Sequence, residues 1–267
     1  EHLGLKLYQN RPTNVLAELV SNSWDADAGE VWIDINKEHL AVYDNGIGMD
    51  RETLVGHYLI IGKRKRIAEN IEVLSPKKRK YMGRKGIGKL APFGIAKKIS
   101  VITISQKDKS CCWFEIDLTE LLDESSSSES SEFKYRPEVI YDSVSINDIE
   151  LSRDKHGYVK EFLVKTKSLG GTLIIMDDLS LKRTVSSSQL MEALGRRFTV
   201  TLIRNDFNVL INGQLVTEKQ SLPEFSYREP EEGFTEETVN FGGVDRLIKY
   251  WVGFVKEAEW PQDQAGV

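Results

Sequence analysis

Two short polar segments, ELVSNSWDADA (Glu18–Ala28) and DNGIGM (Asp44–Met49), constrain the fold more than any other part of the chain. In the first, Glu18, Asn22 and Asp25 recur at i, i+4 and i+7, so on a helix all three side chains project from one face. In the second, a carboxylate precedes a GxG turn, where glycine lets the backbone approach a flat ligand that the carboxylate can hydrogen-bond. A purine would fit there.

The residues around these segments predict one helix followed by two strands. Thr13 or Asn14 can cap a helix through VLAELVSNSWDA, whose apolar side chains fall on one inner side. Apolar residues then alternate over 31–35, and LAVYD follows as a second strand that delivers Asp44 to a strand end. We therefore expect the ligand to lie between this helix and this sheet.

Further strands and helices are predicted beyond Asp50, which is expected to cap a helix through ETLVGHYLI. GIGKLAPFGIAKKI is expected to be a glycine turn that opens a helix, and Asn212-Gly213 predicts a hairpin with a type I′ turn. The other predicted elements are the strands ISVITIS, CCWFEID and GGTLIIMDD and the helix SSSQLMEALGRRF. This alternation predicts an α+β fold, a two-layer α/β sandwich.

Four blocks occur in order along roughly the first two-thirds of the chain. They are ELVSNSWDADA, DNGIGM, GRKGIGKLAPFGIA (Gly83–Ala96) and GGTLIIMDD (Gly170–Asp178). Together they resemble the GHKL ATPases, which include gyrase B, MutL, the large heat-shock chaperones, MORC proteins and the histidine-kinase catalytic domain. The resemblance implies a Bergerat fold with a mixed sheet that binds ATP and Mg²⁺. The LGLKLY segment ahead of the first block favours the MORC-like prokaryotic ATPases.

The resemblance assigns chemical roles to three residues. Glu18 would orient and deprotonate the water that attacks the γ-phosphate, and Asn22 would offer its carbonyl oxygen to Mg²⁺, an ion that takes few protein ligands. Asp44 would accept a hydrogen bond from the adenine amino group and so select adenine over guanine. Each pattern alone also fits a solvated helix stripe or an ordinary DNG hairpin turn, and the neighbouring blocks favour the functional interpretation.

Residues next to Asp44 are expected to contact the adenine. Gly46 and Gly48 would leave room for the ring, while Met49 would cover its face. Thr172 matches the threonine that follows glycine in the last block of the family. Its hydroxyl would support Asp44 or a water molecule beside the adenine.

Phosphate binding is expected at the start of the helix that follows Gly86, because free backbone N–H groups and the positive end of the helix dipole favour anions. Lys63 would either reach the phosphates or be a solvated lysine in a charged loop. The predicted nucleotide-binding residues are Asn22, Asp25, Asp44, Gly46, Gly48, Met49, Lys63, Gly86, Ile87, Gly88, Lys89 and Thr172, with Glu18 as the catalytic residue and Asn22 as the metal ligand.

A strongly basic stretch is hidden within the net charge of −5. Between Gly62 and Lys89 eleven Lys or Arg residues face two glutamates, which gives a local net charge of +9 and leaves −14 for the remainder. Such a stretch is either a polyanion site or a solvated loop. It matches the place of the ATP lid in the family, so we predict a lid at about residues 62–89, and both ATP phosphates and DNA are candidate ligands.

Two domains are expected. Residues 1–222 would form the ATP-binding domain, in which DESSSSESSE (about 123–132) is too polar to pack and predicts a surface insertion. Residues 223–267 would hold a turn-rich connection, PEFSYREPEEGF, and the beginning of a truncated, transducer-type second domain.

Other kinds of site find little support in the sequence. The adjacent Cys111 and Cys112 predict neither a disulfide framework nor a zinc site. The histidines form no recognisable ligand motif, so surface or packing roles are expected for His2, His39, His57 and His156. No apolar run of membrane length and no signal pattern is present, so no membrane partner and a cytoplasmic location are expected.

Glu18 separates the branches of the family. Histidine-kinase domains usually have asparagine there, because their γ-phosphate goes to a histidine and not to water. The first hypothesis is therefore an ATP-driven homodimeric clamp that acts on DNA. The alternatives are a chaperone-like ATPase that acts on client proteins without DNA and a histidine-kinase-type catalytic domain.

Overall fold

The computed structural model describes residues 11–59, 74–82, 88–120, 137–181, 185–202, 206–217, 220 and 225–255. The chain divides into two compact units, Glu1–Gln220 and Ser221–Val267. The predicted polar insertion lies outside the described residues, as do residues 60–73 and 83–87, which hold most of the predicted lid. None of the described helices is long and apolar enough to cross a membrane.

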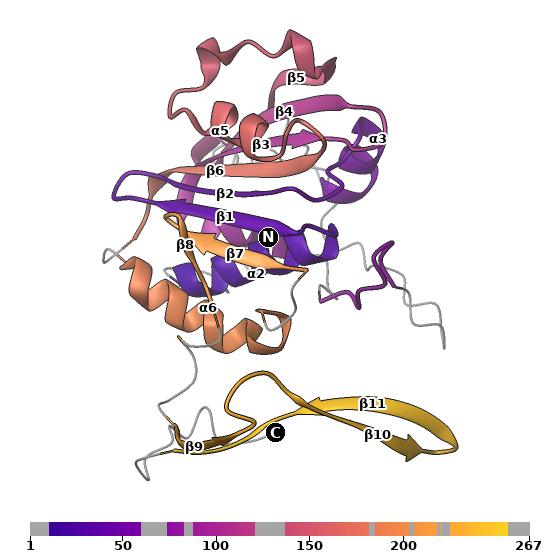
Figure 1. Cartoon of the computed structure of the whole chain (residues 1–267). Helices are drawn as coiled ribbons and strands as arrows, with labels where there is room; N and C mark the ends of the chain where they lie inside the picture. The colour runs from indigo at the N-terminus through magenta and orange to yellow at the C-terminus, as the bar shows by residue number, and fades with distance from the viewer. Residues whose placement is uncertain are drawn as a thin grey trace, which may run out of the picture. The chain divides into compact units, whose positions relative to one another are not determined.

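The first unit is built on an eight-stranded sheet in the order β5-β4-β3-β6-β2-β1-β7-β8 (Figure 1). Its strands are β1 (Glu30–Ile35), β2 (Leu40–Asp44), β3 (Ala96–Ile104), β4 (Ser110–Asp117), β5 (Glu138–Ser145), β6 (Gly171–Leu179), β7 (Asn208–Ile211) and β8 (Gln214–Leu215). All neighbours pair antiparallel except β1 and β7, which are parallel. The predicted mixed sheet and α+β class are confirmed.

Helices cover both faces of this sheet (Figure 1). The main ones are α2 (Pro12–Asp25), α5 (Tyr158–Lys165) and α6 (Ser187–Leu202). Apolar side chains of α2 and α6 share one core cluster with one face of the strands, and those of α5 share a second cluster with the other face. Cys111 belongs to the α5 side and Cys112 to the α2 side, because successive strand residues point to opposite faces. Both cysteines are buried and free.

The N-cap of helix α2 lies two residues before the nearer of its two predicted caps. Its N-cap is Arg11, which makes no side-chain capping bond, so the expected cap at Thr13 or Asn14 is wrong. Pro12 occupies the first turn instead, where a missing N–H costs nothing and the fixed φ suits a helix. The predicted inner side is confirmed, because Leu16 and Leu19 are at most 2% exposed.

Two segments that were predicted to be ordinary helices form a π-helix and a 3₁₀ helix. Asp50 caps α3 (Arg51–Thr53) as predicted, but the chain continues as a π-helix, η1 (Leu54–Tyr58). After residue 87 the chain forms a 3₁₀ helix, η2 (Gly88–Gly94), which contains Pro92. Proline lacks the N–H of a regular α-helical ladder and disfavours the α conformation of the residue before it. The short 3₁₀ helices η3 (Ile146–Asp148) and η4 (Leu151–Arg153) precede α5.

The second unit consists of two strand pairs. They are β9 (Phe225–Glu229) with β12 (Val252–Val255), and β10 (Thr235–Phe241) with β11 (Val244–Tyr250). The interpretation of PEFSYREPEEGF as connection alone was therefore wrong, since its first half forms β9. Phe225 and Tyr227 give that strand the aromatic side chains that extended, paired backbone favours.

Arg79, within the predicted lid, is a core residue. Its side chain is fully buried, with the guanidinium 4.4 Å from the centre of the Trp24 ring. The Nη1 atom donates to the Ala28 carbonyl oxygen at 2.6 Å, and Nη2 donates to the Asp206 carbonyl oxygen at 2.7 Å. One of the predicted lid cations is therefore held inside the fold and cannot bind a polyanion. The Phe207 ring centre lies 5.5 Å from the same guanidinium.

We predict that Arg79→Ala lowers the free energy of unfolding by about 3 kcal/mol, because the Ala28 and Asp206 carbonyl groups lose their donor and a cavity opens beside two rings. Urea unfolding followed by tryptophan fluorescence measures the change. Arg51→Ala, which removes an exposed arginine paired with Asp142, is the control and is expected to shift the midpoint far less. Equal shifts for both variants would contradict a core role for Arg79.

Candidate functional site

Asp44, at the end of β2, is the buried centre of the site. Its side chain points to the α2 face of the sheet, and the residue is only 6% exposed. The carboxylate accepts hydrogen bonds from the Ser23 hydroxyl of α2 at 2.9 Å and from the Gly46 backbone N–H at 2.8 Å. Burial raises the pKa of Asp44 to about 6, while these hydrogen bonds and one from the Thr172 backbone oppose the rise.

The glycines after Asp44 are required by close neighbours within the chain. Gly48 has φ +62°, and a Cβ there would lie 1.8 Å from the Ile104 carbonyl oxygen. A Cβ on Gly46 would lie 2.6 Å from the carbonyl oxygen of Ala26, at the end of α2. No other residue fits either position without moving backbone. The turn is thus fitted between the end of α2 and the end of β3.

Thr103 of β3 connects this turn to β6, and the sequence did not single it out. Its fully buried hydroxyl accepts the Met49 backbone N–H at 2.9 Å and donates to the Gly171 carbonyl oxygen at 3.2 Å. The predicted Thr172 hydroxyl lies 3.3 Å from that of Thr103, while its backbone pairs with Asp44 across the two strands. A threonine inside an alternating strand gives no sequence signal for such a role.

Glu18 and Asn22 lie one turn apart on α2, and both are half-buried. A Cβ on Gly88 would lie 2.6 Å from Glu18 Oε2, so the backbone of Gly88 closely approaches the Glu18 carboxylate. Arg197 of α6, another residue that sequence reasoning missed, places Nη2 3.5 Å from Glu18 Oε1. The Glu18 carboxylate thus lies against the Gly88 backbone and near Arg197, with the Asn22 amide one turn along the same helix.

Asp25 and Asp27 hold the 74–82 segment against the end of α2. Asp25, expected to bind nucleotide, is buried and accepts the Met82 backbone N–H at 2.7 Å. Asp27 adopts φ +58° and accepts from the Ser75 hydroxyl and, at 3.2 Å, from the Lys77 backbone N–H. These bonds give both carboxylates a structural role. The sequence could have pointed to Asp27 only through its place in the DADA end of the first block.

Lys89 is directed toward η1. Its Nζ donates to the His57 carbonyl oxygen at 2.8 Å and lies 6.0 Å from the centre of the Tyr58 ring. Three predicted site residues, Lys63, Gly86 and Ile87, lie outside the described residues. Within the described part, η2 brings Gly88 and Lys89 beside the Glu18 side of α2.

Comparison with known proteins identifies the family. The family model described as "Histidine kinase-, DNA gyrase B-, and HSP90-like ATPase" matches residues 10–149, which is more than half of the chain. The chain belongs to this family. The matched range of this GHKL ATPase domain contains Glu18, Asn22, Asp44 and the glycine turn, so the predicted family is confirmed, while the MORC-like branch stays a prediction.

Two curated relatives match parts of the chain. A "Putative type II restriction enzyme HgiDII" of Herpetosiphon aurantiacus is 35% identical over 211 residues, 79% of this chain and 30% of the relative. The "Chaperone protein HtpG" of Campylobacter jejuni is 34% identical over 97 residues, 33% of this chain and 16% of the relative. The chain thus spans less than a third of the length of either relative.

Two solved structures are also similar. The ATPase and transducer domains of DNA topoisomerase II from Balamuthia mandrillaris are 14% identical, with a TM-score of 0.45 over 78% of this chain and 49% of that one. The N-terminal domain of a DNA repair protein is 18% identical, with a TM-score of 0.43 over 79% of this chain and 50% of that one.

We predict that Asp44→Asn is more stable than the wild-type domain at pH 7. The native pKa of about 6 lies above the ordinary 3.8, so ionisation of Asp44 opposes folding and its cost grows as pH rises from 3.8 through 6. The difference corresponds to about 3 kcal/mol at most, and an amide avoids it.

Urea unfolding of both proteins between pH 4 and pH 7.5 measures the effect. The gap between variant and wild type should be largest above pH 6 and should close toward pH 4. Asp148→Asn, at an exposed residue of η3, serves as the control for the general pH dependence. A variant that is less stable than wild type at pH 7 would show that the carboxylate hydrogen bonds outweigh its burial.

Proposed function

We propose that the domain binds Mg-ATP between α2 and the strand ends that carry Asp44 and Thr172, and hydrolyses it with Glu18 as the general base. The observation that carries the proposal is the Ser23 to Asp44 hydrogen bond, at 2.9 Å. It joins the buried carboxylate of β2 to the helix that also carries Glu18. An adenine acceptor and a water-activating carboxylate thus belong to one rigid unit, as the family chemistry requires.

Asp44 is suited to the adenine amino group. Three internal hydrogen bonds, from Ser23, Gly46 and the Thr172 backbone, occupy only part of the acceptor capacity of a carboxylate, which has about four lone-pair sites. Because the carboxylate is buried, a hydrogen bond from the adenine amino group would strongly favour binding. Guanine would place a carbonyl oxygen there, which has no proton to donate to the carboxylate. Adenine is therefore preferred over guanine.

Glu18 is suited to water activation. It is half-buried and lies against the Gly88 backbone, at the start of the segment expected to bind phosphate. Asn22, one turn along, offers a neutral oxygen that fits Mg²⁺, an ion that keeps most of its water ligands. When bound, the ion would neutralise charge on the phosphate oxygens. Arg197, 3.5 Å from Glu18, would turn the carboxylate toward or away from the water.

We predict that Glu18→Gln still binds ATP but hydrolyses it at least about 10²-fold more slowly, the scale of a lost general base. ATP affinity is measured with a fluorescent analogue, and turnover by phosphate release. Glu161→Gln, on α5 at the opposite face of the sheet, is the control and is expected to retain turnover. Unchanged turnover in Glu18→Gln would remove this residue from the mechanism, and a parallel loss of binding would make it a binding residue.

The partner that the ATPase cycle serves is proposed to be DNA, held by a homodimer that closes on ATP binding. The 35% identical relative is named a putative type II restriction enzyme, and it aligns with 79% of the chain. The basic stretch adds exposed cations at Lys77 and Lys78, beside the buried Arg79. A chaperone-like cycle is the second candidate, because HtpG of Campylobacter jejuni is 34% identical over 97 residues.

We predict that the protein binds duplex DNA with an affinity that falls with salt and rises with a non-hydrolysable ATP analogue. Fluorescence anisotropy of a labelled duplex measures affinity, and sedimentation measures dimer formation with the same analogue. Replacing Lys77 and Lys78 by glutamine should weaken binding and reduce the slope of log affinity against log salt by about 2. Lys160→Gln, on α5, is the matched control.

Two results would separate the candidates. Turnover and affinity that do not respond to DNA or salt would exclude the clamp on DNA. Stimulation of turnover by unfolded client protein, without DNA binding, would support the chaperone-like cycle.

A further inference from the structure

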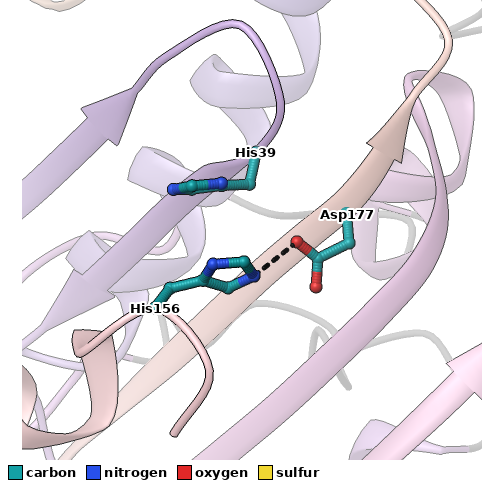
Figure 2. Close-up of side chains that lie close together, drawn as sticks. All are labelled: His39, His156 and Asp177. Carbon is teal, nitrogen blue, oxygen red and sulfur yellow. Dashed lines mark hydrogen bonds and ion pairs between the residues drawn. The ribbon is translucent and has the colours of Figure 1, made fainter.

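Two histidines and an aspartate lie close together (Figure 2). Strand alternation places them on the face of the sheet opposite to Asp44. His39 lies immediately before β2, Asp177 lies in β6, and His156 lies in the loop just before α5. One ligand atom from each residue lies within 4.8 Å of the others. We propose that this cluster is a binding site for a divalent transition-metal ion of the Zn²⁺ class, distinct from the nucleotide site.

The backbone brings these three residues together. Leu40 pairs with Met176 in the antiparallel register of β2 and β6, so His39 and Asp177 are the next neighbours across the two strands. Side chains alternate along a strand, which places both on the α5 side with the second core cluster. The loop before α5 then delivers His156 over the same spot. A span of 117 positions separates the two histidines, so no local motif announces them.

The three side chains already lie close together. His156 Nε2 lies 3.0 Å from Asp177 Oδ1, and the His39 and His156 rings are stacked with centres 4.1 Å apart (Figure 2). Asn36 fixes the His39 ring through a contact of 2.6 Å to Nε2, while His39 Nδ1 is buried and has no hydrogen-bond partner. A buried ring nitrogen without a partner is costly, and a metal ion would satisfy it.

The geometry and charge suit a small transition-metal ion. Ligand atoms around a tetrahedral Zn²⁺ lie roughly 3.3 Å apart, so closure needs at most about 1.5 Å of side-chain movement. Two imidazoles and one carboxylate form a donor set typical of such ions, with a position left for water. Beside His156 and Asp177 is a hollow whose lining has more carboxylates than cations, which favours a cation; its carboxylates include Glu115, Asp117 and Asp154.

Such an ion would link β2, β6 and the loop before α5 on the face of the sheet opposite to the proposed nucleotide site. β2 and β6 carry the proposed ligands at one end and the Asp44 and Thr172 pair at the other, five residues away and on the opposite face. That distance is on the order of 17 Å along the strands. Contact between the ion and ATP is thus excluded, and the expected effect of binding is on the stability of the strand pair and of α5.

Metal binding by the full chain tests the proposal, with Co²⁺ as the optical probe and Zn²⁺ as the competitor. We expect one Co²⁺ per chain, visible absorption bands that Zn²⁺ abolishes, and a rise of about 5 °C in the unfolding temperature at a Zn²⁺ concentration a hundredfold above its Kd. His156→Gln should lose the bands and the thermal shift. Asp177→Asn, a milder change, should weaken binding at least about tenfold.

Two control variants test whether loss of Co²⁺ binding comes from a general disturbance of β6 or from a histidine outside the cluster. Asp178→Asn alters the neighbouring carboxylate of β6, whose φ of +52° asparagine also tolerates. His57→Gln alters an exposed histidine on η1. Both should bind Co²⁺ as the wild type does. Absence of stoichiometric binding, or binding that survives both His156→Gln and Asp177→Asn in proteins with native circular dichroism, would overturn the proposal.

Discussion

The hydrogen bond between the Ser23 hydroxyl and the buried Asp44 carboxylate is the contact on which the rest of the site depends. A carboxylate at 6% exposure is unfavourable unless donors surround it, and here they come from α2, from the glycine turn and from β6. Those donors fix the helix, the turn and the strand relative to one another. The domain therefore retains a charge that opposes folding, and gains a rigid acceptor where a ligand can use it.

Around this contact, charged residues divide between structure and surface. Arg79 lies against two aromatic rings, while the neighbouring Lys77 and Lys78 remain exposed. Asp25 and Asp27 likewise accept hydrogen bonds from the 74–82 segment. A run of charges in a sequence therefore mixes residues that hold the 74–82 segment to α2 with residues that are exposed to solvent. Only burial and partners distinguish the two kinds.

Short-range sequence patterns correctly predicted elements that depend on neighbouring residues, such as caps and hairpin turns, or that bury an apolar face. The strands β1, β2 and β6, the cap at Asp50, and the Asn212-Gly213 hairpin with φ of +47° and +79° were all confirmed. Helices that contain proline or compete with close packing departed from the pattern, as η2 did around Pro92. The strand β9 was missed because turn-type residues in its segment outweighed its two aromatic residues.

The sequence by itself determined the family and the spacing of Glu18, Asn22 and Asp44, because those residues sit on one helix and one strand end whose geometry is set by local periodicity. The tertiary structure decided everything that depends on residues distant along the chain. Thr103 reaches Met49, Arg197 reaches Glu18, and His156 joins the turn before β2, only because the sheet register and helix packing bring them together. Such contacts leave no periodic signal, since each partner lies in a different element.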